Sequence, residues 1–358
     1  MILSLNVWIM SLGKNNAFNL HYHRQRAGLS QAELAARAGI SRAAVSSIET
    51  ESVVPSVRAA LAIARVLDCT VEELCGGTAA ESPSFRWAVE PGPGCTRFWE
   101  SQEIDTSLRF PVEALALNPF PPDGFLSGGS NRKTPAIPSL ALACCDPAAR
   151  FFASEFEKLS GVRMLVLPRN GRQALQLLSQ GSVHLGGIHA ATEENPDANV
   201  QRVRSVLGEG WALLRLTDWR TGIAVANGTT ARTANGAIKA ARRWAMREKG
   251  AAARECLDEL LGARKASGRV VGGHREVADA VKWGWADAGI TLELCAAENS
   301  LRFVSVRTEG LDLVFSTRLL ADPRVKKLIA MIQSRAFRRP GEAPTGYSTA
   351  RAGNLVLT

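Results

Sequence analysis

The sequence has 358 residues, of which 46% are hydrophobic and 22% charged, and its formal net charge is +9. This composition is ordinary for folded domains, and it excludes a wholly disordered, collagen-like or disulfide-scaffold chain. The length predicts about two domains, at roughly 100–200 residues each. No apolar run approaches the roughly 20 residues that span a bilayer, so we expect no membrane partner.

The N-terminus and the cysteines both favour a cytoplasmic protein. Residues 1–16 lack a cationic start and a small-residue cleavage site, which predicts a flexible extension rather than a signal peptide, with Met10 as an alternative start. The seven cysteines include no C-x-x-C pair, and their number is odd. They predict reduced thiols, with no disulfide framework, no metal site and no cofactor.

Residues 17–77 carry the clearest local signals, and these predict five short helices. Ser30 is placed to cap a helix over Gln31–Ala38, and Glu33 closes a capping box with it. Gly39 then permits a tight turn into the next helix. Two short helices joined by a glycine turn form a helix-turn-helix arrangement.

The helices after that turn have equally clear starts. Ser41 is expected to cap a helix over residues 42–50, and Ser56 a further helix. The inner face of this further helix is predicted to hold Val57, Leu61, Ala64 and Leu67.

The segments RQRAGLSQAELAARAGISRAAVSSIE and PSVRAALAIARVLDCTVEEL resemble the lambda-repressor/Cro-like (Xre-type) helix-turn-helix family over residues 19–77. The resemblance implies that the third helix enters the major groove of double-stranded DNA and that the protein is a homodimer. The residues expected to contact DNA are Gln31, Arg42, Ala43, Ala44, Ser46 and Ser47. The family pattern also pairs Glu49 with Arg24 on the first helix, which implies a structural ion pair.

Two features depart from that family. The family usually has a glycine and a basic residue just after the third helix, whereas this chain has Glu51 near the glycine position and no cation. Residues 1–77 carry 7 basic and 6 acidic side chains, a balance of only +1, so nonspecific DNA affinity is expected to be weak. A domain that has lost DNA binding and only mediates association stays an alternative.

Residues 78–138 are rich in glycine, proline and serine, and they predict an interdomain linker with short β segments that pack on the next domain. Trp87 and Trp99 are expected to be packing anchors there.

From residue 139 to 353, apolar runs such as LALACC and VRMLVLP alternate with helical patterns, which predicts an α/β fold with a parallel sheet. The fold class is therefore multidomain: an all-α five-helix helix-turn-helix domain followed by an α/β domain of two lobes.

The segments CCDPAARFFASEF, LPRNGRQALQLLSQGSVHLGGIH, HREVADAVKWGWADAGI and GYSTARAG resemble the type II periplasmic-binding-protein-like domain, in the subfamily related to molybdate-binding proteins. The resemblance covers most of residues 139–353. It implies two lobes joined by crossing strands, which we expect near Thr221–Ala226 and Leu311–Ser316, with the second lobe at about residues 227–310.

Ligands of such folds lie at the carboxyl ends of strands, against helix N-termini whose N–H groups suit an anion. The loops in those places supply the predicted ligand-binding residues Asp146, Asn170, Gly171, Arg172, His189, Thr192, Lys249, Gly250, Ala251 and His274. Structural alternatives stay open: Asp146 as a helix cap, His189 as a packed core residue and Arg172 as a solvated one. The family's Gly-Ser-Gly-like loop is replaced by Gly250 and three alanines, so an oxyanion, another small molecule or no ligand all stay possible.

The two resemblances together predict a ligand-responsive, one-component transcriptional regulator. The alternative is an intracellular solute-binding protein with a vestigial DNA-binding domain. No nucleophile–base pair, metal-ligand cluster or phosphate loop stands out in the sequence, so no catalytic residue is assigned and an enzyme is not expected.

Overall fold

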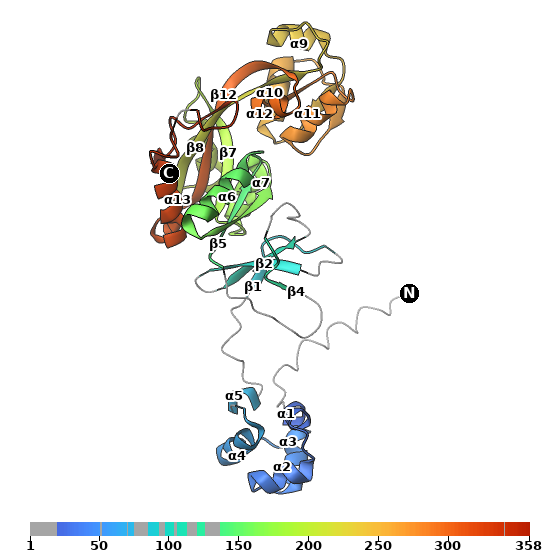
Figure 1. Ribbon diagram of the computed structural model, residues 1–358, viewed down its shortest axis with the longest axis vertical. Helices are drawn as coiled ribbons and strands as arrows, with labels where there is room; N and C mark the ends of the chain where they lie inside the picture. The colour runs from blue at the N-terminus through green and yellow to red at the C-terminus, as the bar shows by residue number, and fades with distance from the viewer. Residues whose placement is uncertain are drawn as a thin grey trace. The chain divides into compact units, whose positions relative to one another are not determined.

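The computed structural model describes residues 20–50, 52–69, 71–74, 85–92, 97–103, 106–112, 120–125, 137–339 and 341–358. The chain forms two compact units, Met1–Ser84 and Phe85–Thr358 (Figure 1). The predicted extension over residues 1–16, the unusual Glu51 and residues 78–84 of the predicted linker lie outside the described residues. No helix in the described part is long and apolar enough to cross a membrane.

The first unit is a small helical bundle. Its helices are α1 (Leu20–Arg26), α2 (Gln31–Ala38), α3 (Arg42–Glu49), α4 (Val57–Leu67) and α5 (Val71–Leu74). The predicted capping box is confirmed, because the Ser30 hydroxyl accepts the Glu33 N–H while the Glu33 carboxylate accepts the Ser30 N–H. Gly39 ends α2 in the left-handed conformation, with φ of 66°, as the tight turn requires.

The prediction for the inner face of α4 was partly wrong. Val57 and Leu61 are 77% and 43% exposed, whereas Ala60 and Ile63 are buried with the correctly predicted Ala64 and Leu67. Both sets of residues satisfy helical spacing, so periodicity alone could not choose between them. In the structure α4 is oriented so that the larger Ile63 lies in the core with Leu34 and Val45.

The second unit begins with a four-stranded sheet. Its strands are β1 (Phe85–Trp87), β2 (Arg97–Gln102), β3 (Ser107–Pro111) and β4 (Gly124–Phe125), in the order β1-β3-β2-β4. Trp99 is buried in a core shared with the larger sheet, and its indole donates to the carbonyls of Phe120 and Pro121. Arg163 in the larger sheet binds Asp123 beside β4, which ties the small sheet to the domain that follows.

The larger sheet runs in the order β10-β9-β11-β8-β12-β7-β5-β6, and two short C-terminal strands pair with β8. Its strands are β5 (Ser139–Cys144), β6 (Arg163–Pro168), β7 (Leu185–Thr192), β8 (Trp211–Val225), β9 (Trp244–Met246), β10 (Gly268–Val270), β11 (Ala288–Leu292), β12 (Arg302–Ser316), β13 (Tyr347–Ser348) and β14 (Leu355–Leu357). The expected parallel sheet is mixed instead: β5 pairs in parallel with β6 and β7, but β12 is antiparallel to both β7 and β8.

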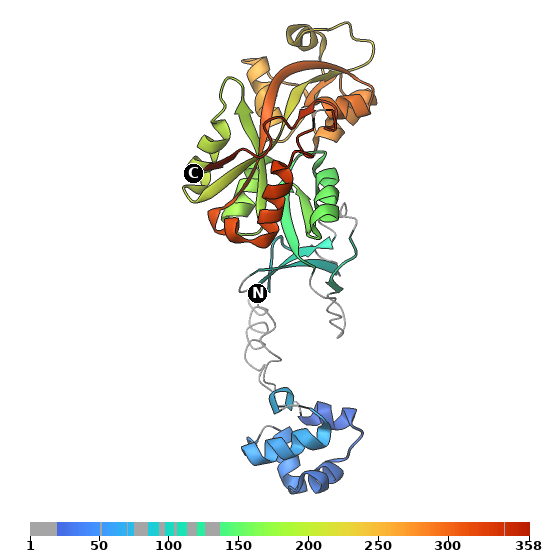
Figure 2. The same cartoon turned by 60° about the vertical axis from the view of Figure 1, so that its left-hand side comes forward.

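Helices group around the two ends of the long strands. The helices of the larger domain are α6 (Ala149–Ser160), α7 (Gly171–Ser179), α8 (Ala198–Leu207), α9 (Ala234–Ala240), α10 (Ala252–Leu261), α11 (His274–Lys282), α12 (Glu293–Glu298) and α13 (Pro323–Gln333), with a 3-10 helix at Thr317–Ala321. Figures 1 and 2 show α9 to α11 around one end of β8 and β12, and α6 and α13 around the other. We call the part with α6, α7, α8 and α13 lobe 1 and the part with α9 to α12 lobe 2.

The strands β8 and β12, of 15 residues each, run through both lobes. In lobe 1, β8 pairs with β13 up to Trp219, and from Thr221 onward it pairs with β11 in lobe 2. On β12, the pairing with β7 of lobe 1 begins at Glu309. The exchange of partners therefore lies at residues 219–221, at the start of the first expected crossing, and at residues 307–309, before the second expected crossing at Leu311–Ser316.

Gly222 lies just beyond this exchange, where the strands approach closely. A Cβ there would lie 2.3 Å from the Val304 carbonyl oxygen, so a backbone atom would have to move. We expect Gly222→Ala to lower the free energy of unfolding by about 1–3 kcal/mol. Gly171→Ala, where the nearest atom is 3.6 Å away, is the matched control and should be neutral or slightly stabilising. Equal effects in denaturant unfolding would contradict this account of the crossing.

Candidate nucleic-acid interface and ligand cleft

The predicted DNA contacts lie on the solvent side of α3. Ser41 caps this helix, and its hydroxyl accepts the Ala44 N–H. Val45 and Ile48 face the core, which leaves the N-terminal half of the other face open to solvent. On that face Arg42 and Ala43 are exposed, and Ala44, Ser46 and Ser47 are partly exposed. This is the part of a recognition helix that reaches base edges when the helix lies in a major groove.

Glu49, at the end of α3, connects this helix to α1 and α2. Its carboxylate accepts hydrogen bonds from Arg24 Nε at 2.6 Å and from Gln31 Nε2 at 2.8 Å. The predicted partners Arg24 and Glu49 are therefore brought together, and Gln31 joins them through its amide nitrogen. Burial would raise the pKa of Glu49, but the hydrogen bonds from Arg24 and Gln31 outweigh it, so this pKa is lowered.

Replacing Arg24 by methionine keeps an apolar stem but leaves Glu49 without its charged partner. We expect the free energy of unfolding of this unit to fall by about 1–3 kcal/mol, somewhat less than for breaking a fully buried pair. Because the folded-state pKa of Glu49 is lowered, the pair stabilises the fold above the usual glutamate pKa of about 4.3. The difference between native and Arg24→Met proteins should therefore disappear as the pH falls through the folded-state pKa.

Native-state hydrogen exchange of the α2 and α3 amides measures the free energy of unfolding of the first unit separately from that of the second. Arg65→Met removes an exposed cation from α4 and is the matched control. A loss of the same size in both variants, or one that is independent of pH, would contradict the role given to the Arg24–Glu49 pair.

In the second unit, the predicted ligand-binding loops meet between the two lobes. Cys145 and Asp146 follow β5, and His274 begins α11, where all three line a cavity of about 690 Å³. Asn170 caps α7 in lobe 1, and its amide donates to Glu248 of lobe 2 at 2.8 Å. The cleft thus has helix N-termini on both sides, which is an arrangement that favours an anion.

Gly250 lies beside Arg172 across the same cleft. A Cβ on Gly250 would lie 3.1 Å from Cδ of Arg172, and Gly250 has a φ of +90° that favours glycine. Gly171 is the first residue of α7, next to Arg172. Ala251 is buried and precedes α10, whereas Lys249 is exposed. The predicted loops of the two lobes are therefore in contact.

Two predicted residues serve local structure. Thr192 accepts the Asn195 N–H through its hydroxyl, in the turn that follows β7. Asp146 is buried, and its carboxylate accepts the Ala148 N–H and the Tyr347 hydroxyl. The helix that follows begins at Ala149, after the Asp146 carboxylate closes a short turn onto the Ala148 N–H.

His189 lies between a carboxylate and a thiol beside the cleft. Its Nδ1 lies 2.8 Å from the carboxylate of Glu309, and its Nε2 lies 3.2 Å from Cys145 Sγ. The same Glu309 oxygen accepts hydrogen bonds from Trp219 Nε1 and Thr221 Oγ1, and Arg307 Nε binds the other oxygen at 2.7 Å. Glu309 is 1% exposed, so these partners replace water completely.

The pKa values reflect these contacts. Burial would lower the pKa of His189, but Cys145 and Glu309 outweigh it and raise this pKa to about 10. Burial would raise the pKa of Glu309, but the hydrogen bond and charge of His189, with Arg307, lower it to about 2. Burial and the nearby charge of Arg247 lower the pKa of His274.

Three side chains converge on one point of the cleft. Among the described residues, ligand-type atoms of Cys145, His189 and His274 lie within 4.8 Å of one another. Sequence reasoning missed Glu309 as a site residue; it placed the Cys145-Asp146 loop at the cleft but gave Cys145 itself no role. No sequence signal singled out Glu309, because its strand also holds Arg307, Thr308 and Asp312; Cys145 follows a buried strand but has no motif around it.

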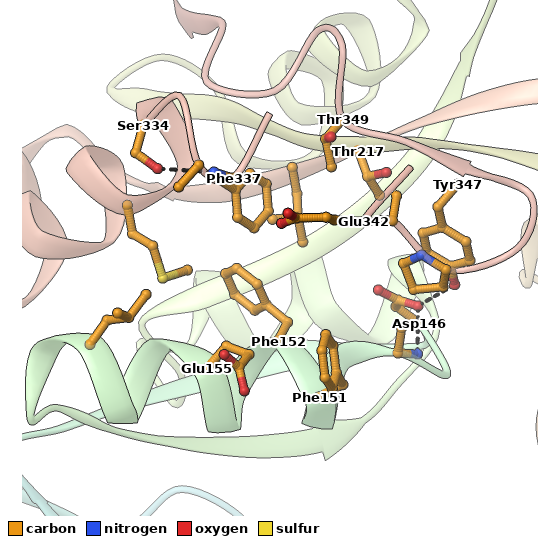
Figure 3. Close-up of a pocket in the computed structure, with 17 residues that line it drawn as sticks. Asp146, Phe151, Phe152, Glu155, Thr217, Ser334, Phe337, Glu342, Tyr347 and Thr349 are labelled. Atoms are coloured by element: carbon orange, nitrogen blue, oxygen red, sulfur yellow. Dashed lines mark hydrogen bonds between the residues drawn. The ribbon is translucent and has the colours of Figure 1, made fainter. Parts of the chain in front are cut away.

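A second, apolar cavity of about 290 Å³ lies between α6, α13 and the C-terminal segment. Figure 3 shows Phe151, Phe152 and Phe337 along this cavity, and Asp146 with Tyr347 at one end. Burial raises the pKa of Asp146, and the hydrogen bond from Tyr347 opposes that rise. Asp146 lines both this cavity and the cavity of about 690 Å³, so it lies between the two.

Comparison with known families agrees with this architecture. A profile of the PBP superfamily domain matches residues 153–333, half of the chain. The chain belongs to the PBP superfamily. A helix-turn-helix family profile matches residues 20–74, which are the helices of the first unit.

Individual relatives of this PBP superfamily chain are distant. The uncharacterized protein YvgK of Bacillus subtilis (strain 168) is 28% identical over 188 residues, which are 50% of this chain and 60% of YvgK. This chain thus spans less than two thirds of that relative.

Two solved structures are similar to the second unit. The tungstate binding protein TupA from Desulfovibrio alaskensis G20 is 11% identical, with a TM-score of 0.43, over 59% of this chain and 98% of TupA. A putative phosphate ABC transporter substrate-binding protein from Clostridium perfringens, with bound phosphate, is 12% identical, with a TM-score of 0.46, over 56% of this chain and 95% of that one.

Proposed function

We propose that this chain is a ligand-responsive transcriptional regulator that works in the cytoplasm. The observation that carries the proposal is the presence, in one chain, of a helix-turn-helix unit with an open α3 face and a two-lobed unit with a ligand cleft. The first supplies recognition of double-stranded DNA, and the second supplies a site for a small effector. No reaction is needed for this function, and we assign no catalytic residue.

The DNA-binding role rests on α3 and its support. Arg42 is exposed at the start of α3, where a guanidinium can pair with guanine in the major groove or hold a phosphate. Gln31 begins α2, where N–H groups favour a phosphate. We propose a homodimer that binds two half-sites roughly 34 Å apart, which is one turn of the double helix.

The effector is proposed to be a small anion or another small molecule bound between the lobes. The N-termini of α6 and α11 line the cavity of about 690 Å³, and they offer N–H groups and partial positive charge. Molybdate and tungstate are members of this class. Ala251 and its neighbours offer no hydroxyl, so an oxyanion would be held there by backbone N–H groups alone.

Coupling between the effector and DNA requires a difference in affinity. An effector that contacts both lobes binds the closed arrangement better than an open one, and only this difference can shift the protein between two states. The Asn170–Glu248 contact shows that the lobes meet across the cleft. The expected consequence of binding is a change in operator affinity of about 5–150-fold, the usual range of allosteric coupling.

Arg42→Ala tests the DNA-binding role. Genomic fragments that the full chain enriches are the probe, and binding is titrated against salt. We expect the variant to lose about 1–3 kcal/mol of binding free energy at its best sites if Arg42 pairs with guanine.

Arg65→Ala, which removes the same charge from α4, should change affinity little. Equal losses in the two variants, or no salt-sensitive binding by the native chain, would contradict the proposal. In the second case a solute-binding protein with a vestigial DNA-binding domain becomes the better description, and ligand-induced thermal stabilisation without DNA binding would support it.

A further inference from the structure

The point where Cys145, His189 and His274 meet has the features of a built site. Cys145 and His189 come from lobe 1, His274 comes from lobe 2, and their ligand-type atoms lie within 4.8 Å of one another. The distance from Cys145 Sγ to His189 Nε2 is 3.2 Å. Both histidines are at least nine-tenths buried, and the cavity of about 690 Å³ opens beside Cys145 and His274.

His274 gives a second, independent indication. Its side chain is 3% exposed, and its Nδ1 is buried without a hydrogen-bond partner among the described residues. A buried polar nitrogen that lacks a partner is costly, and structures retain such groups mainly where a ligand, ion or water satisfies them. The backbone holds His274 firmly, because the Thr291 hydroxyl donates to its carbonyl.

We propose that Cys145, His189 and His274 bind a zinc-class transition-metal ion between the two lobes. One thiol and two imidazoles suit zinc and its borderline neighbours, whereas magnesium and calcium prefer oxygen ligands. Tetrahedral zinc with bonds of about 2.0–2.3 Å places its ligand atoms roughly 3.3–3.6 Å apart. Cys145 and His189 are already close to that spacing, and the ligand-type atom of His274 lies within 4.8 Å of theirs, so a small closure of lobe 2 would bring it into range.

The surroundings of His189 support this site. A histidine that binds a metal through one nitrogen usually gives its other N–H to a carboxylate, which fixes the ring orientation. Glu309 occupies that place, 2.8 Å from His189 Nδ1, and is itself held by Trp219, Thr221 and Arg307. The nitrogen facing Cys145 is therefore the one directed to the metal, and Glu309 is a positioning residue.

Three protein ligands leave one tetrahedral position open. It faces the cavity beside the N-termini of α6 and α11, where a water molecule or a small anion can complete the coordination. This site goes beyond the proposed function, because it follows from the cleft alone and holds whether or not the chain binds DNA. A metal shared by the two lobes would stabilise their closed arrangement.

Cobalt(II) is the probe for the test, since its visible and near-ultraviolet absorption reports tetrahedral geometry and bonding to a thiolate. The full chain should bind one Co²⁺ per protomer with both signals, and Zn²⁺ should displace it. Cys145→Ser should abolish the thiolate band. His274→Gln should weaken Zn²⁺ affinity at least ~100-fold. Glu309→Gln should weaken Zn²⁺ affinity by about 10–100-fold, as expected for a residue that positions a ligand.

Cys69→Ser, in the other unit, is the matched control and should keep the native spectrum and affinity. Circular dichroism of each variant shows that it is folded, and mass spectrometry adds a second readout, because Zn²⁺ should protect Cys145 from alkylation in the native chain. A thiolate band that survives in Cys145→Ser, or no tetrahedral Co²⁺ spectrum in the native chain, would overturn the inference. Because no DNA is present, this outcome is separate from the failure of the proposed regulator.

Discussion

The carboxylate of Glu309 is the constraint on which the cleft depends. It is a buried charge at the point where β8 and β12 pass from one lobe to the other, and a buried charge is tolerated only when its hydrogen bonds are satisfied. His189 on β7, Trp219 and Thr221 on β8, and Arg307 on β12 supply those bonds. Satisfying Glu309 therefore fixes three strands relative to one another, and with them the floor of the cleft.

A second buried network extends this constraint into lobe 1. Arg215 on β8 binds Asp312 on β12 and Asp218 on its own strand. Asn199 on α8 donates to the carbonyl of Gly310 and the carboxylate of Asp312, and it accepts the N–H of Ala190, next to His189. Arginines thus serve in part in internal ion pairs. Residues 1–77, which include the helix-turn-helix unit, carry only +1 of the net charge of +9, so that charge is no measure of affinity for DNA.

The sequence predicted best what is encoded locally. The caps at Ser30 and Ser41 and the glycine turn at Gly39 are read from neighbouring residues, and all three are present in the structure. The loops around Asn170 and Gly250 followed from the general rule that ligands lie at strand ends. The partnership of His189 with Glu309 could not be predicted, because the two residues are 120 positions apart and depend on strand register. Local sequence also did not reveal that RFVSV (302–306) and LDLVFS (311–316) belong to the single strand β12, whose pairing with β8 has two register shifts.

Coupling of the cleft to DNA occupancy within one chain can be measured as genome-wide occupancy in the protein's own cells. The native chain is compared with Arg42→Ala, His189→Gln and His274→Gln at equal protein levels. We expect Arg42→Ala to lose its sites, whereas both cleft variants should keep the same sites with altered occupancy. Unchanged occupancy in both cleft variants, or the absence of defined sites for the native chain, would contradict this coupling.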